Sequence, residues 1–489
     1  MCPLIQEIST AHTPETLIEQ LGDEAGLVLL RSSLFDSPEA RCSFLATRPF
    51  LTFRSSGSRC ELRTKFEHQT QFGDPWRLLE SLMLRYELLD EMDLPFPLGG
   101  CFGYWGYDLK NFAEPRLSRR AVNDLELADC QVGFYDSLVV FDHRLDKSWI
   151  ISTGLNADGS RSDMRAQEQL EFWLHRLNLS AERRPPKVRE TASRTRKDSN
   201  GSVVSNLSRG DFLDRVTRAQ NYIRSGDIYQ VNLSQRLAAA WPFSGMELFN
   251  QLSAVSPASF SAYLNCGDYQ IASSSPELFL RLSGQHIQTR PIKGTRPRSA
   301  DLTRDAQLTY ELQTSPKEMS ELVMITDLLR NDLGKVCEFG SVQVPELVRL
   351  ERYPQVQHLV STVEGRLRPD ISHFAAFSAC FPGGSITGAP KFRAMDIIDE
   401  LEPLCRGPYT GALGYLGFNR DSQLSIVIRA AICKQGRAFF QVGAGIVADS
   451  IAAAEYEETL AKARGFFQAL QMAEPNNLPQ IASLEQYSF

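Results

Sequence analysis

Residues 269–293 read YQIASSSPELFLRLSGQHIQTRPIK, two strand-like runs separated by Ser283-Gly284. A Ser-Gly pair between apolar runs favours a tight turn, so the segment predicts a β-hairpin. Pairing about that turn places Glu277 opposite Arg290. The hairpin therefore carries a carboxylate near one end of a sheet.

Lys293 lies at the same end of the hairpin, roughly 10 Å beyond Arg290 at about 3.3 Å per residue. Strict alternation would direct the two side chains to opposite faces, but Pro291 and Gly294 are residues that interrupt or bulge a strand. The Lys293 amine and the Glu277 carboxylate can then enter one cavity. An ordinary salt bridge at a strand end is the alternative.

Two helical stretches each carry a pair of glutamates three residues apart. Glu318 and Glu321 lie in SPKEMSELVM, and Glu455 and Glu458 lie in AAAEYEETLAK. That spacing places both carboxylates of a pair on one helix face, where like charges repel slightly. Two such pairs facing one cation are consistent with Mg2+, which prefers oxygen ligands. Two solvated helix faces are the alternative.

Two glycine-rich turns, FPGGSITGAPK (381–391) and QVGAGIVAD (441–449), contain backbone N–H groups that can bind a carboxylate or a phosphate. Neither is a P-loop or a dinucleotide fingerprint, so nucleotide binding is not supported. A third segment, LGGCFGYWGYD (98–108), contains the G-x-C-x-G pattern of a glutaminase nucleophile. None of the seven histidines lies in a His-x-Glu context, so we interpret Cys101 as structural.

The composition excludes several classes of protein. The chain has 489 residues and a formal charge of -7, without the clustered basic face that nucleic acid needs. No apolar run approaches the roughly 18 residues of a membrane span, and the N-terminus lacks the pattern of a signal peptide. The ten cysteines form no C-x-x-C motif and no Cys/His cluster. We therefore expect a cytoplasmic protein with reduced thiols that binds neither nucleic acid nor membrane.

Short apolar runs alternate with helical patterns, which is typical of an α+β protein. The stretch 182–208 has no aromatic residue and is rich in charge, serine and proline, so it predicts a flexible linker. It divides an N-terminal region (1–181) from a catalytic region (209–472), and a short tail (473–489) follows. Ser208 is the expected cap of the first helix after the linker.

Four motifs follow one another along the chain: PIKGTRPR (291–298), SELVMITDLLRNDLGKV (320–336), GGSITGAPK (383–391) and GAGIVADS (443–450). With them the chain resembles the chorismate-utilising enzymes, a family of anthranilate, aminodeoxychorismate, isochorismate and salicylate synthases. The resemblance covers most of residues 210–470 and is weaker in the N-terminal half. It implies two facing β-sheets flanked by helices, with the active site in the cleft between them.

The resemblance also implies the residues of the site. Mg2+ would be held mainly by Glu321 and Glu458, with Glu318 and Glu455 in support through water. Contacts to the substrate would come from a larger set on the strands and turns around the cleft: Arg429, Tyr409, Lys462, His358, Thr295, Ser385, Thr387, Gly388, Gly443, Ala444 and Gly445.

Two positions separate activities within the family. Isochorismate and salicylate synthases carry a water-activating lysine where this chain has Gln230, which disfavours water as the nucleophile. Anthranilate synthases usually read PIAGT, whereas this chain reads PIKGT, with the Lys293 that is typical of aminodeoxychorismate-forming members. In addition, the segment with Leu30, Arg31 and Ser32 resembles the inhibitory tryptophan pocket of relatives, and a structural relic is the alternative there.

The resemblance implies amination of chorismate to 4-amino-4-deoxychorismate, the precursor of p-aminobenzoate and folate, with ammonia from a separate glutamine amidotransferase subunit. Lys293 is expected to attack C2 of the ring while Glu277 protonates the departing 4-hydroxyl, and ammonia then adds at C4 and expels the lysine. Mg2+ would neutralise and orient the ring carboxylate. The alternatives are an anthranilate synthase large subunit and a catalytically silent binding protein on the same fold.

Overall fold

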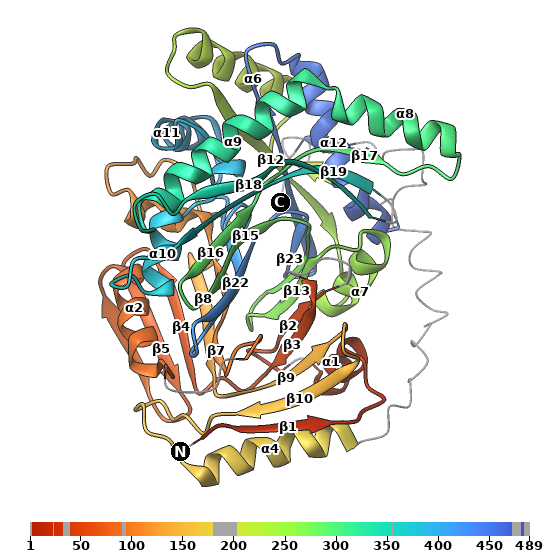
Figure 1. Ribbon diagram of the computed structural model, residues 1–489. Helices are drawn as coiled ribbons and strands as arrows, with labels where there is room; N and C mark the ends of the chain where they lie inside the picture. Colours follow the sequence, from red (N-terminus) through yellow and green to blue (C-terminus); the bar gives the residue numbers. More distant parts are fainter. Residues whose placement is uncertain are drawn as a thin grey trace.

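The computed structural model describes residues 2–22, 24–32, 40–89, 94–178, 203–353, 356–471 and 481–483. Its strands form two large, almost entirely antiparallel sheets with helices packed around them (Figure 1). This arrangement confirms the predicted α+β class with two sheets flanked by helices.

Among the described residues, the first sheet has thirteen strands. Its spatial order is β1 (Leu4–Ile8), β10 (Lys147–Ser152), β9 (Ser137–Asp142), β3 (Cys42–Ala46), β2 (Val28–Arg31), β13 (Phe260–Asn265), β14 (Gln270–Ser275), β23 (Ala430–Lys434), β24 (Arg437–Ile446), β12 (Gln230–Ala240), β11 (Val203–Ser205) and β25 (Ile481–Ser483), with β20 (Gly388–Ala389) beside β12.

The second sheet runs in the order β17 (Ile292–Pro297), β19 (Val356–Arg366), β16 (His286–Arg290), β15 (Leu278–Ser283), β22 (Asp421–Ile426), β21 (Ala412–Gly417), β7 (Gly100–Trp105), β8 (Cys130–Tyr135), β4 (Leu51–Ser56), β5 (Arg59–Thr64) and β6 (His68–Phe72), with β18 (Gln343–Arg352) beside β19.

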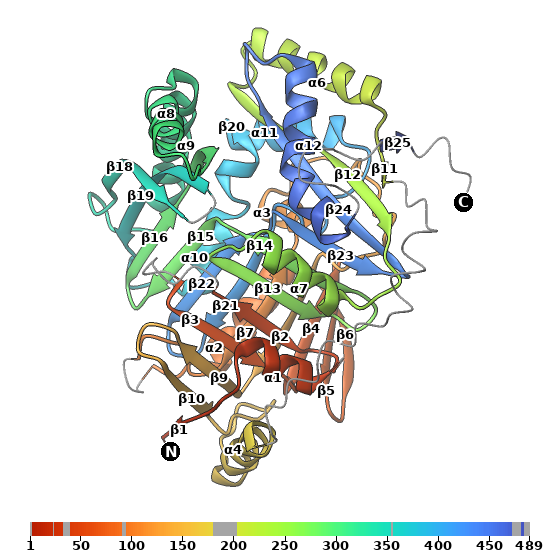
Figure 2. The same ribbon diagram turned by 90° about the vertical axis from the view of Figure 1, so that its right-hand side faces the viewer.

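The helices cover the outer faces of the sheets. Figure 2 shows α8 and α9 on one side of the upper half of the molecule, with α6 and α12 to their right. The helical segments are α1 (Pro14–Leu21), α2 (Pro75–Tyr86), η2 (Tyr107–Leu109), α3 (Lys110–Ala113), α4 (Asp163–Asn178), α6 (Arg209–Arg224), α7 (Gly245–Val255), α8 (Leu302–Gln313), α9 (Pro316–Gly334), α10 (His373–Cys380), η3 (Gly384–Ile386), α11 (Lys391–Leu401) and α12 (Ala452–Ala469).

The alternation of side chains along β7 shows why the sheets face each other. Phe102 and Tyr104 point into a core shared with β2, β3 and β21, whereas Cys101 and Trp105 point to the opposite face, which is covered by α2, α9 and α10. All four side chains are fully buried, so both faces of this strand exclude water. The sequence of a strand that is buried on both faces is an uninterrupted run without charged residues, as GGCFGYW is.

Both sheets combine strands from the two halves of the chain. β2 pairs with β13, and β7 pairs with β21. Of the expected linker, residues 182–202 lie outside the described part of the chain. The expectation of a flexible segment up to residue 208 is wrong at its end, because residues 203–205 form β11 between β12 and β25.

The structure corrects the register of the hairpin. Leu278, not Glu277, lies opposite Arg290, and the turn residues are Gly284 and Gln285. Gly284 adopts φ 55°, a conformation that glycine reaches without a steric penalty, and a bulge between Leu278 and Arg281 changes the register again.

The helix expected after the linker begins as predicted. The Ser208 side chain accepts a hydrogen bond from the Asp211 backbone in a capping box. In the described part of the chain, no helix combines the length and the apolar character that a bilayer crossing requires.

Candidate functional site

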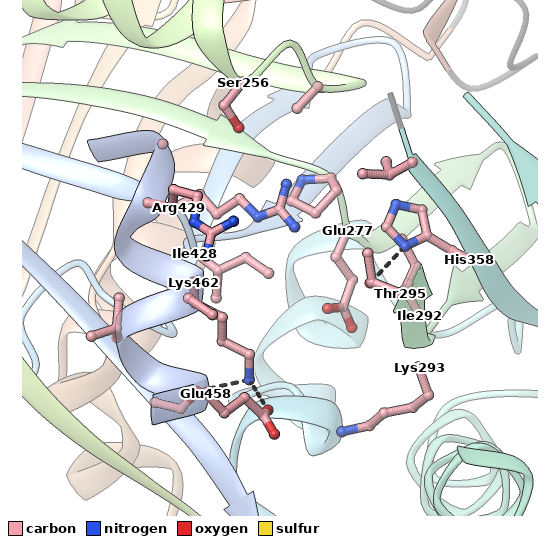
Figure 3. A pocket seen from close by; sticks show the side chains of 18 of the residues that line it. Ser256, Glu277, Ile292, Lys293, Thr295, His358, Ile428, Arg429, Glu458 and Lys462 are labelled. Atoms are coloured by element: carbon pink, nitrogen blue, oxygen red, sulfur yellow. Dashed lines mark hydrogen bonds and ion pairs between the residues drawn. The ribbon is translucent and has the colours of Figure 1, made fainter. Parts of the chain in front are cut away.

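A cavity of about 710 Å3 lies between the two sheets, at the end where α9 and α12 approach each other. Its walls come from β17 and β19, from β24, from these two helices, and from the loops before β15, β21 and β23. The cavity brings together most of the residues expected from the sequence: Glu277, Lys293, Thr295, Glu318, Glu321, His358, Ser385, Tyr409, Arg429, Gly443, Gly445, Glu458 and Lys462. Figure 3 shows how several of these side chains converge.

Glu277 and Lys293 both enter this cavity, as the interrupted strand predicted. The backbone directly after Lys293 departs from a regular strand, because Gly294 adopts φ 66° and the pairing of β17 with β19 shifts between Lys293 and Thr295. Glu277 is only 6% exposed. Burial raises the pKa of its carboxyl, although a hydrogen bond with Ser385 and the charges of Lys293 and Lys462 oppose the shift. The site thus holds a carboxyl that retains its proton more readily than a carboxyl in water.

Lysines and carboxylates alternate along the part of the wall that β17, α9 and α12 form. The Lys293 Nζ atom lies 3.8 Å from Glu321 Oε2. Lys462 Nζ lies 2.8 Å from Glu458 Oε1 (Figure 3). It also donates a hydrogen bond to the Gly443 carbonyl oxygen at 2.8 Å. Burial raises the pKa of Glu321, whereas the neighbouring lysines lower it. For Glu458, burial works against the lysines, and the net effect is a lowered pKa.

The donor set of this wall fits a hard divalent cation. The carboxylates of Glu318, Glu321 and Glu458 line the same cavity, and the charges of Glu318 and Glu458 both contribute to raising the pKa of Glu321. A divalent cation would relieve that repulsion, and carboxylates suit Mg2+. Within the described ranges, no three acidic, histidine or cysteine side chains are already gathered at ligand distance. Each carboxylate instead pairs with a lysine or an arginine, which it would exchange for the metal.

The other wall is suited to an anion. Arg429 lies in the left-handed region at φ 51°, and burial lowers the pKa of its guanidinium. No carboxylate in the described part of the chain forms a salt bridge with it. His358 is hydrogen-bonded to Thr295 over 2.8 Å between Nδ1 and Oγ1. Burial and the charge of Arg429 lower the pKa of His358 to about 4, so its ring is neutral at physiological pH. Arg429 is therefore the cation available to a substrate carboxylate here.

Some expected residues lie outside the cavity wall. The Thr387 hydroxyl donates to the Gly383 and Gly384 carbonyl oxygens and so stabilises the turn itself, while Gly388 pairs with Val231 of β12. Ala444 points into the core under α6, α11 and α12.

Glu455 lies behind the cavity wall, where it accepts a hydrogen bond from Ser450 at 2.6 Å. The segment Leu30, Arg31 and Ser32 lines a separate, small cavity of about 40 Å3. Cys101 is fully buried, and burial raises the pKa of its thiol far above the usual range, so it is a structural residue as interpreted.

The cavity also contains residues that the sequence did not single out. Lys317 has its Nζ atom 3.7 Å from Glu455 Oε1, and Arg296 pairs with Glu318 at 3.4 Å. Lys317 could have been found from its spacing, because it lies one helical turn before Glu321 on the same helix face. Asn232 lines the cavity beside Tyr409, where its side chain lowers the pKa of the Tyr409 hydroxyl through a hydrogen bond, against the larger effect of burial. It lies two residues after Gln230, on the same face of β12.

Comparisons with known proteins relate the chain to enzymes that bind chorismate. The family model described as "chorismate binding enzyme" matches residues 35–468. Anthranilate synthase component 1 of Acetivibrio thermocellus is 37% identical over 474 residues, which is 96% of this chain and 95% of that protein. Aminodeoxychorismate synthase component 1 of Bacillus subtilis is 36% identical, with 89% and 90% covered. The crystal structure of anthranilate synthase component I from Streptococcus pneumoniae superposes with a TM-score of 0.75 at 31% identity, covering 88% of this chain and 92% of that one.

Proposed function

This chain belongs to the family of chorismate binding enzymes, and we propose that within it the chain aminates chorismate to 4-amino-4-deoxychorismate. The relatives include both aminodeoxychorismate and anthranilate synthases at nearly equal identity, so similarity alone supports a chorismate-utilising enzyme of one of these two types. The observation that carries the finer proposal is the Lys293 side chain, which enters the cavity beside the buried carboxyl of Glu277.

In the proposed reaction the neutral amine of Lys293 attacks C2 of the ring, and both conjugated double bonds of the ring move by one position, round through C1, C6 and C5 to C4. The C4–O bond breaks, and Glu277 delivers its proton to the departing hydroxyl, which leaves as water. Ammonia then attacks C4, both double bonds move back, and the C2–N bond to Lys293 breaks, with the proton that the added nitrogen loses balancing the one that the departing amine takes up. Arg429 and the N–H groups of Gly443 and Gly445 hold the carboxylates of the substrate. Mg2+ bound by Glu321 and Glu458, with Glu318 and Glu455 in support, would neutralise the ring carboxylate. The ammonia would come from a partner glutamine amidotransferase subunit.

The deciding experiment is product analysis by liquid chromatography and mass spectrometry. The purified chain is incubated with chorismate, Mg2+ and an ammonium salt, and 4-amino-4-deoxychorismate is the expected product. Glutamine in place of the ammonium salt should give no product without the partner subunit. Anthranilate and pyruvate would establish the second activity of the family instead, and an unchanged chorismate pool would favour a binding protein.

The Lys293→Ala variant tests the covalent step. It should lose the protein adduct that the wild-type chain forms with chorismate in the absence of ammonia, as seen by intact-protein mass spectrometry, and should turn over at least about a hundredfold more slowly. Lys335→Ala is the matched control, because this lysine pairs with the buried Asp332 on α9 and does not line the cavity. An undiminished rate of the same product in Lys293→Ala would refute the covalent role.

A further inference from the structure

A fully buried ion pair lies directly behind the wall of the substrate cavity. Arg406 and Glu402 have side chains that are 1% and 4% exposed. They form two parallel hydrogen bonds, from Nε to Oε2 at 2.8 Å and from Nη2 to Oε1 at 2.7 Å. A buried pair of this kind is weak evidence for stability, since apolar residues of similar volume often serve as well. Its other contacts indicate what it does.

The remaining N–H groups of Arg406 connect three separate segments of the wall. Nη2 donates to the Asn232 carbonyl oxygen on β12 at 2.7 Å, and Nη1 donates to the Ile386 carbonyl oxygen in η3 at 3.2 Å. The third segment is the corner before β21, where Nη1 donates to Thr410 Oγ1 at 3.1 Å and the guanidinium lies 5.6 Å from the Tyr409 ring centre. Asn232, Ile386 and Tyr409 all line the cavity, whereas Arg406 does not.

The corner that Arg406 holds has an unfavourable backbone conformation. Thr410 is completely buried with φ 58°, a left-handed conformation that is rare for a β-branched residue and costs on the order of 1–3 kcal/mol. Its hydroxyl accepts from Arg406 and donates to the Tyr409 carbonyl oxygen at 2.7 Å. Such a conformation persists only where surrounding contacts enforce it, and this one turns Tyr409 toward Gly443 on the opposite wall.

We propose that Arg406 is a positioning residue that, with its charge balanced by Glu402, fixes the spacing of the three wall segments around the substrate. It acts through Asn232, through the turn that carries Ser385, and through Tyr409, without touching the substrate. The proposal rests on the proposed function only in that the cavity takes chorismate, and it does not depend on which product forms.

The test compares chorismate binding with stability. Arg406→Lys keeps the charge but cannot make all five hydrogen bonds, so calorimetry should show chorismate bound at least about tenfold more weakly. Arg281→Lys is the matched control, since Arg281, whose side chain is partly buried, also donates two hydrogen bonds to one buried carboxylate, that of Asp421, away from the cavity. That variant should lower the melting temperature and leave chorismate affinity unchanged. If Arg406→Lys loses stability like the control and binds chorismate normally, the pair is merely structural and the proposal is wrong.

A second pair of variants tests the positioning role of Arg406 even if Arg406→Lys does not fold. Thr410→Val removes the hydroxyl that Arg406 contacts while preserving shape, and Thr410→Ser retains it. We expect weaker chorismate binding by about threefold to tenfold in the valine variant and near-normal binding in the serine variant. Equal affinities in both would overturn the proposal. Wild-type protein that binds chorismate but forms anthranilate would refute the proposed function alone, whereas wild-type protein that fails to bind chorismate would refute both.

Discussion

Glu277 combines its role in the proposed reaction with a cost to folding. Its carboxyl is buried, and burial raises its pKa, so the folded chain keeps this proton to a higher pH than the unfolded chain does. Between the unfolded pKa and the raised folded pKa the native state therefore binds more protons, and stability falls as the pH rises through this window. A neutral residue at this position would avoid that loss.

We predict that Glu277→Gln melts at a higher temperature than the wild type at pH 7–8 while losing at least about a hundredfold in turnover. Scanning calorimetry between pH 4 and 8 should show the two melting curves converging toward the acidic end. Glu346→Gln, at a partly exposed glutamate paired with Arg349, should show no such divergence. A melting temperature of Glu277→Gln that stays below the wild type at pH 8 would contradict this account.

At the scale of single residues, the sequence predicts which side chains reach the site better than it predicts which residues they contact. PIKGT and three of the four paired glutamates identified side chains that the structure brings into one cavity, whereas Glu455 lies behind its wall. The predicted cross-strand pair of Glu277 and Arg290 was wrong, because Leu278 takes that place. A shift of one residue in the turn is enough to change every pair along a hairpin. Arg406 could not be found from local pattern, since the contacts that link it to other wall segments go to the carbonyl oxygens of Asn232 and Ile386, which are distant in sequence.

At the scale of a single element, α9 contributes both carboxylates and a competing cation to the cavity. Lys317 lies one turn before Glu321 and 3.7 Å from Glu455. Burial lowers the pKa of Lys317, but the charges of four surrounding glutamates together raise this pKa by more than burial lowers it, so the net shift is upward. The lysine thus balances part of the charge that Mg2+ would otherwise neutralise.

We therefore predict that Lys317→Met binds Mg2+ about tenfold more tightly by titration calorimetry, and that its melting temperature in the absence of metal is lower than that of the wild type. Lys335→Met, at the residue that caps the C-terminus of α9, should leave the Mg2+ affinity of the protein unchanged. Identical Mg2+ affinities for Lys317→Met and the wild type would show that Lys317 does not compete with the metal.

Local signals predicted the helices better than the shortest strands. The Ser208 capping box and the Ser315-Pro316 start of α9 are encoded within four residues, and both helices begin there. β11 has three residues, and its partner strand β12 begins 25 positions after it ends, so no local pattern identifies it. Its place in the sheet depends on long-range pairing.

At the scale of the whole molecule, buried histidines link stability to acidity. Burial lowers the pKa values of His358 and His373 to about 4, against 6.5 for the free side chain. His373 is held between Ser422 and the Gly284 carbonyl oxygen at 2.9 and 2.8 Å. Because the unfolded chain binds more protons between these values, stability should fall as the pH drops from about 6.5 to 4.

The expected result is a melting temperature that decreases steadily over this range, with a smaller decrease in His373→Gln, which can still form a hydrogen bond at the site. His68→Gln, at an exposed histidine on β6, should reproduce the wild-type slope. Equal slopes for all three proteins would assign the acid sensitivity to other groups.

The interleaving of the two sheets also affects how the protein is made. β7 lies in the middle of the second sheet, yet its neighbour β21 begins only about 300 residues later, a delay on the order of 15–60 s at about 5–20 residues per second of synthesis. Until then β7 offers an open apolar edge on the ribosome, where other nascent chains can pair with it. Because strands of the two halves pair in both sheets around the cavity, neither half can complete the sheets alone, and we expect the exposed edge of β7 to need protection during translation.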